Sequence, residues 1–169
     1  EDPLNQAVMK AWQAGVVVVA SAGNNGPDPM TIGVPGNVPY IITVGAMTDN
    51  FTESDQSDDK VATFSAAGPT PAGFVKPEIV APGGHIPGLM AFDTEIVAAH
   101  PEYPAGGKYF DMSGTSQAAA VVSGVAALML MQEPSLTPDQ VKCRLMDSAH
   151  TAMTEEGKLA YSVFQQGSG

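Results

Sequence analysis

The sequence is short of cysteine, of basic residues and of charge in general. Its 169 residues include one cysteine, seven lysines and arginines, and 18 aspartates and glutamates, so the net charge is −11. The single thiol of Cys143 excludes an internal disulfide framework and a zinc site built from several cysteines. The acidic balance argues against nucleic acid and anionic membranes as partners, because both attract basic protein faces.

Long hydrophobic runs are also missing. The longest, at 118–131, has 14 residues and is broken by Ser123 and Gly124, whereas a membrane-spanning helix needs about 20. This run predicts a central helix that is apolar on all faces and buried beneath a sheet. The chain length predicts a single core, and no signal peptide is visible.

Local patterns predict alternating helices and strands. Asp2 and Pro3 are typical of a helix start, and the valine-rich run 16–20 predicts a fully buried parallel strand. Thr137 and Gln140 form a capping box at the start of another helix. Cys143 falls in that helix, where we expect a small buried hydrophobe. These patterns favour an α/β fold, with a mostly parallel sheet flanked by helices.

The segment 114–118, Gly-Thr-Ser-Gln-Ala, is the most informative stretch of the chain. Ser116 opens the apolar helix, so its hydroxyl and N–H lie at the positive end of the helix dipole. Gly114 lets the backbone approach a ligand closely, an arrangement suited to nucleophilic attack by the serine. An N-capping serine without a catalytic role is the competing interpretation.

A second polar segment follows the valine run. Asn24 comes at the carboxyl end of the predicted strand, where open α/β sheets bind their ligands. Its side-chain amide can donate to an oxyanion. The alternative is a turn asparagine that bonds its own backbone, as is common before glycine.

Three motifs together resemble one family. The segments 21–26 (Ser-Ala-Gly-Asn-Asn-Gly), 76–83 (Lys-Pro-Glu-Ile-Val-Ala-Pro-Gly) and 113–119 (Ser-Gly-Thr-Ser-Gln-Ala-Ala) resemble the subtilisin-like serine proteases, the subtilases, in that family's order. The resemblance implies a partial subtilisin-like fold and a secreted protein that hydrolyses polypeptides through an acyl-enzyme. Ser116 would be the nucleophile. The amide of Asn24 and the backbone N–H of Ser116 would form the oxyanion hole.

The base and the orienting acid of such an enzyme are not recognisable. His85, His100 and His150 all follow Asn24, and none lies in the His-Gly-Thr setting of the family. We therefore expect 1–169 to be the C-terminal portion of a catalytic domain, with the Asp and His motifs upstream. The expected partner is the remainder of that domain, and we expect the isolated chain to be inactive because no base activates the serine.

The resemblance also implies substrate-binding residues. Gly33 matches the family's glycine at the base of the primary specificity pocket, with Ala22 and Gly23 on the pocket wall. Gly114 and Thr115 precede the nucleophile and are expected to contact the substrate. Such a pocket would be roomy and apolar, and would accept large hydrophobic side chains.

No cofactor is expected, but a structural cation is one alternative. By resemblance, the backbone carbonyls of Gly36, Val38 and Ile41 would hold calcium or a monovalent ion, although an ordinary turn fits as well. The acidic segment 49–59 could also chelate calcium, but a solvated loop is favoured. The Gly- and Pro-rich segment 84–111 is expected at the surface near the active site, with a short strand near 95–98.

Several positions differ from the usual family pattern. Gln117 stands where many subtilases have Met, and Ala120 and Val121 stand where Pro-His is common. These differences put neither Ser116 nor Asn24 in doubt. A non-catalytic subtilase-like binding or structural module of a larger protein is the alternative, and it would be favoured by the lack of Asp and His motifs upstream. An α/β-hydrolase is disfavoured, because Ala118 rather than Gly lies two residues after Ser116.

Overall fold

A mixed sheet lies at the centre of the chain. The computed structural model describes residues 2–52, 54–91 and 93–169. Strands β1 (Val19–Ser21) and β4 (Ile79–Pro82) pair in parallel with opposite sides of β2 (Ile42–Thr48), and the short β3 (Lys60–Val61) pairs antiparallel with the end of β2. The predicted α/β fold with a mostly parallel sheet is confirmed.

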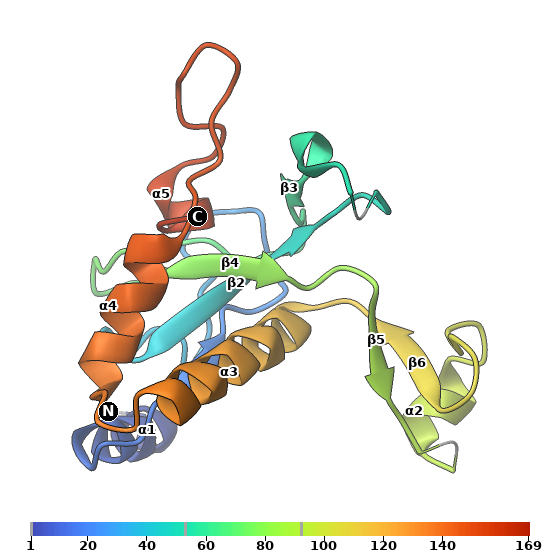
Figure 1. The fold of residues 1–169 in the computed structure, drawn as a ribbon, viewed down its shortest axis with the longest axis horizontal. Helices are drawn as coiled ribbons and strands as arrows, with labels where there is room; N and C mark the ends of the chain where they lie inside the picture. Colours follow the sequence, from blue (N-terminus) through green and yellow to red (C-terminus); the bar gives the residue numbers. More distant parts are fainter. Residues whose placement is uncertain (1, 53, 92) are drawn as a thin grey trace.

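Helix α3 (Thr115–Gln132) crosses one face of this sheet (Figure 1). Ala118, Val122 and Ala126, spaced four residues apart, form its buried face. The predicted burial on all faces is wrong, because Leu128 is 61% and Met131 75% exposed. In the described part of the chain, no further layer covers this outer face. By length and composition α3 could cross a membrane, a test that core helices of soluble proteins also pass.

The valine run is less buried than predicted. β1 covers only its last part, and Val16 is 53% exposed. Within the described residues, β1 pairs with β2 on one side and its other edge has no partner strand. The run therefore forms an edge strand, although its parallel orientation is as predicted.

Two amphipathic helices lie beyond the amino ends of the strands (Figure 1). Asp2 caps α1 (Pro3–Gln13), and the predicted capping box opens α4 (Pro138–Ser148). The Trp12 indole N–H donates to Asp139 over 3.0 Å and joins the two helices. Cys143 is exposed, contrary to prediction, because it lies about 200° around α4 from the buried Val141.

The segment 84–111 projects beyond the start of α3 (Figure 1). Its strands β5 (Ile86–Leu89) and β6 (Tyr109–Met112) form an antiparallel pair. The strand predicted near 95–98 is wrong, because α2 (Glu95–Ala99) is helical. An acidic first residue and two alanines favour that helix. The short helices η1 (Gln56–Asp58) and α5 (Val163–Gln166) complete the fold.

Candidate active site

The carboxyl end of β4 lies directly against the start of α3. The Gly114 N–H donates to the Gly83 carbonyl over 2.8 Å. A Cβ on Gly83 would lie 2.8 Å from both the Ala46 Cβ and the Gly114 carbonyl oxygen. Glycine at position 83 therefore permits the close approach that positions the helix start on the sheet.

A second set of contacts ties the turn after β1 to the same helix start. The Asn24 Oδ1 accepts hydrogen bonds from the Thr115 backbone N–H and hydroxyl, each over 2.9 Å. The Thr115 Oγ1 in turn accepts from the Gly23 N–H over 3.1 Å. Thr115 is fully buried, so these bonds hold Asn24 in one orientation.

This orientation leaves the amide nitrogen of Asn24 available. Because Oδ1 faces Thr115, Nδ2 points the other way, and it lies 3.3 Å from where a Cβ on Gly114 would be. Across 2–52, 54–91 and 93–169, no protein group accepts a hydrogen bond from Nδ2 or from the Ser116 backbone N–H. The Asn24 Nδ2 beside Gly114 and the N–H of Ser116, two residues further along the chain, are thus donors without an acceptor among these residues, as binding of an anionic oxygen would require.

Ser116 itself is exposed at the second position of α3. Its hydroxyl forms no hydrogen bond with the residues that the structure describes. The first N–H groups of an 18-residue helix favour negative charge at this point. The geometry brings the predicted Ser116, Asn24, Gly114 and Thr115 together.

None of the three histidines is bonded to Ser116 within the described ranges. The His85 backbone N–H donates to the Ser113 hydroxyl over 2.9 Å, and its ring packs on Phe51 at 4.3 Å. His100 pairs with Glu102 over 3.2 Å. In the described ranges, the Ser116 hydroxyl therefore shares no hydrogen bond with a histidine.

An apolar hollow opens beside the nucleophile, between α3 and the β5–β6 hairpin. Ser116 and Gln117 contribute one wall, and Ile86, Phe110 and Met112 contribute the other. The segment 84–111 was expected near the active site, but these individual residues were not singled out. Their convergence depends on hairpin pairing, which a Gly- and Pro-rich segment does not reveal.

The residues predicted for the specificity pocket also lie together. The Gly33 N–H donates to the Ala22 carbonyl over 3.0 Å. Ala22 is fully buried against Ile32 and Ala66, so its side chain faces the core. A Cβ on Gly33 would meet no atom within 4 Å, which shows open space above that glycine.

The expected cation turn is occupied by other contacts. The Gly36 carbonyl accepts from the Thr43 hydroxyl over 2.7 Å, and Val38 is buried in the core. The Ile41 carbonyl accepts from the ammonium groups of Lys76 and Lys142, over 2.9 and 3.3 Å. Sequence reasoning did not single out these lysines.

The buried lysine has an altered acidity. Lys76 has a fully buried side chain, and its ammonium lies 2.6 Å from Glu78. Burial lowers the pKa of Lys76 from 10.5 to about 8, while the charge and hydrogen bond of Glu78 oppose that shift.

The acidic segment 49–59 is organised by its own hydrogen bonds. Asp58 accepts from Thr52 and Asn50, and these bonds lower the pKa of Asp58. No three metal-binding side chains gather anywhere in the described residues. Glu53, counted among the acidic residues of this segment, lies outside the described residues.

Known proteins resemble this chain over most of its length. The model of the peptidase family described as the subtilase family matches residues 1–169. Serine protease AprX of Bacillus subtilis is 51% identical over 142 residues, which are 84% of this chain and 32% of that protein. Subtilisin DY of Bacillus licheniformis is 36% identical over 148 residues, 86% of this chain and 44% of the relative.

Solved structures agree with these similarities. The S41 psychrophilic protease superposes with a TM-score of 0.75 at 28% identity, and Sphericase with 0.73 at 28%. Each comparison covers 98% of this chain and 50% of the other. The chain thus spans from about a third to a half of the length of these relatives.

Proposed function

Because this chain belongs to the subtilase family, we propose that it carries the nucleophile and oxyanion-binding half of a secreted serine endopeptidase. The observation that carries the proposal is the orientation of Asn24. Its Oδ1 is held by Thr115, so its Nδ2, which has no acceptor in the described part of the chain, remains a donor beside Gly114.

The reaction follows from these positions. The Ser116 Oγ forms a bond to the carbonyl carbon of a peptide, and the π electrons of that carbonyl move onto its oxygen. The Asn24 Nδ2 and the Ser116 N–H donate to this oxyanion. The serine proton passes to a base and then to the leaving amine, which departs as the acyl-enzyme forms. Water then hydrolyses the acyl-enzyme.

The base must come from outside the described residues, and two features indicate where its carrier docks. A groove lined by the valine run and α3, including Val18, Ala126 and Leu130, follows the open edge of β1. The outer face of α3 is apolar and exposed. Relatives about twice as long have further chain to cover such a surface. The occupant we propose is the remainder of the same catalytic domain.

Polypeptides are the proposed substrates, because relatives of this family are proteases. Gly33 and the adjoining 22–23 segment would hold the residue before the cut bond, in the open space above Gly33. The hollow between Gln117 and the β5–β6 hairpin would hold an apolar residue near Ser116. Apolar lining favours hydrophobic side chains there.

A chimera tests this function. The chain replaces the 142-residue region of Serine protease AprX with which it aligns at 51% identity. We expect the chimera to hydrolyse a peptide substrate and to react with a fluorophosphonate probe. Ser116→Ala should abolish both. Ser123→Ala should abolish neither, because Ser123 is exposed and its hydroxyl donates to the Ala119 carbonyl of its own helix.

The isolated chain provides the complementary measurement. Without a base, we expect its reaction with the probe to be far slower than that of the chimera. Equal labelling rates would contradict the need for an external base. A folded chimera with no hydrolysis and no labelling would favour the alternative function, a non-catalytic subtilase-like binding or structural module.

A further inference from the structure

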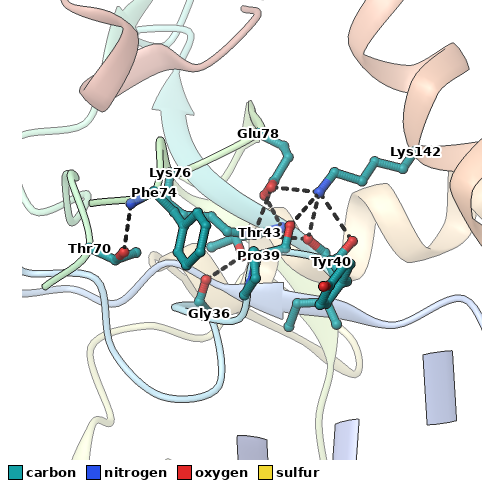
Figure 2. A network of polar contacts seen from close by, with 10 residues as sticks. Gly36, Pro39, Tyr40, Thr43, Thr70, Phe74, Lys76, Glu78 and Lys142 are labelled. Carbon is teal, nitrogen blue, oxygen red and sulfur yellow. Dashed lines mark hydrogen bonds and ion pairs between the residues drawn. The ribbon is translucent and has the colours of Figure 1, made fainter. Parts of the chain in front are cut away.

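At the amino end of the strands, the turn expected to bind a cation is contacted by α4 and by the residues that precede β4 (Figure 2). Lys142, on α4, donates to the carbonyls of Pro39, Tyr40 and Ile41 over 3.0, 3.1 and 3.3 Å. It also lies 2.8 Å from Glu78. One ammonium group therefore contacts four oxygen atoms, much as a metal ion would.

The second lysine of the cluster, Lys76, lies two residues before Glu78 in the chain. The Lys76 Nζ donates to the Ile41 carbonyl over 2.9 Å and to Glu78 Oε1 over 2.6 Å. The other carboxylate oxygen, Oε2, accepts from the Thr43 backbone N–H over 2.7 Å. Both oxygens of Glu78 are thus already engaged.

The charges of this cluster do not suit a metal ion. Two ammonium groups face one carboxylate, so the cluster carries one excess positive charge. Ammonium groups only donate hydrogen bonds and cannot act as ligands. Calcium requires six to eight oxygen ligands, usually with carboxylates among them. The residues present therefore do not fit the cation that the family resemblance implies.

We propose that the ammonium groups of Lys76 and Lys142 take the place of a bound cation at the carbonyls of residues 39–41 and hold this turn without metal. Because the ammonium groups are covalently attached, their occupancy does not depend on the concentration of a free ion. Lys142 also connects α4 to the turn and to the residues preceding β4. The lysines thus couple three segments that a free ion would otherwise join.

The melting temperature in the presence and absence of cations tests this inference. We compare the wild-type chain with Lys142→Met, which removes the ammonium but keeps most of the stem. Melting temperatures are measured in a chelator and in about 10 mM calcium, a concentration above the weakest extracellular dissociation constants of about 1 mM. They are also measured in sodium and in choline salts at matched ionic strength, to test for a monovalent ion. The wild type should melt at one temperature in all of them.

Lys142→Met should melt lower in chelator, because the Pro39 and Tyr40 carbonyls lose their ammonium donor and the Ile41 carbonyl keeps only that of Lys76. It should then regain about 3 °C or more on saturation with a cation, as expected for ligand at about ten times its dissociation constant. Lys142→Arg keeps the charge and should show no such response. Arg144→Met, an exposed change on the same helix, is the matched control and should also show none.

Two results would overturn the inference: a cation-dependent rise in the wild type as large as that of Lys142→Met, or a folded Lys142→Met without any rise. If that variant fails to fold, calorimetric titration of the wild-type chain with calcium decides. Heat from stoichiometric binding that Glu78→Gln abolishes contradicts the proposal, and no such heat supports it. None of these results depends on whether Ser116 is catalytic.

Discussion

The two ends of the same parallel strands treat their polar groups in opposite ways. At the carboxyl end, Asn24 Nδ2 and the Ser116 N–H remain unpaired among the described residues and belong to exposed residues. At the amino end, Lys76, Glu78 and Lys142 engage one another and the surrounding carbonyls. One end thus keeps donors free for a substrate, while the other uses its donors to hold the chain together.

The difference shows how to tell a binding site from a structural cluster. A donor held in place by its neighbours but lacking an acceptor is preorganised for a ligand. A buried charge with all of its partners is costly to disturb but has little capacity left to bind anything. Substitutions at the amino end should therefore alter stability, and substitutions at the carboxyl end should alter chemistry.

The largest effect is expected from a substitution in the lysine–glutamate cluster at the amino end of the strands. Glu78→Gln leaves the buried Lys76 ammonium without its counter-charge, and we expect a loss of about 3–5 kcal/mol in the free energy of unfolding. Urea unfolding followed by circular dichroism measures it. The exposed Glu133→Gln, which loses its pair with Arg144, should cost less than about 1 kcal/mol. Equal losses in the two variants would contradict the comparison.

The next largest effect is expected at the carboxyl end, from a substitution that removes the Asn24 donor but keeps its hydrogen bonds to Thr115. Asn24→Asp keeps the oxygen that accepts from Thr115 but replaces the donor by a negatively charged oxygen. We expect turnover of the AprX chimera to fall by at least about 10²–10³, the range known from subtilisin itself for loss of such a donor. The melting temperature should stay close to that of the unchanged chimera.

The role of Thr115, which orients Asn24, can be distinguished from the role of the Asn24 donor itself. Thr115→Val removes the hydroxyl that bonds Asn24 and Gly23 but keeps the backbone bond to Asn24. Turnover should fall less than in Asn24→Asp. A larger fall in Thr115→Val would show that the donor role assigned to Asn24 is wrong.

A fourth substitution tests the contact between the end of β4 and the start of α3. Gly83→Ala places a methyl group 2.8 Å from the Ala46 Cβ and the Gly114 carbonyl oxygen. We expect a loss of about 1–3 kcal/mol in unfolding free energy, together with slower probe labelling of Ser116 in the chimera. Gly88→Ala, whose new Cβ would meet no atom within 4 Å, should change stability by less than about 0.5 kcal/mol.

The smallest expected effect is a pH dependence of the free energy of unfolding, caused by Lys76 at the amino end of the strands. Lys76, which faces Glu78 and Lys142, has a pKa of about 8 in the folded chain instead of 10.5. Between these values the unfolded chain binds the proton more tightly, so this group makes the fold more stable as pH rises. From about pH 7.5 to 9 the gain should be about 1 kcal/mol. The test is the unfolding free energy of the wild type minus that of Lys76→Met, measured across this window. We expect this difference to rise with pH, and a fall would contradict the predicted direction.

Much of the secondary structure could be predicted because its signals are local. The caps at Asp2 and Thr137 satisfy N–H groups within three residues of themselves, so the bonding pattern is visible in the sequence. Errors arose where burial depends on distant chain. Cys143 and the outer face of α3 are exposed because of what packs, or does not pack, against them.

By itself, the sequence determined the subtilase motifs, the chemical identity of Ser116 and Asn24, and the alternation of helices and strands. Tertiary structure alone decided which atom of the Asn24 amide faces outward, because its partner Thr115 lies 91 residues away. It also placed Lys142 on a carbonyl 101 residues before it. Helix caps and motifs depend on neighbouring residues and can be found in the sequence. The pairing of these polar atoms depends on which distant segments come together on folding.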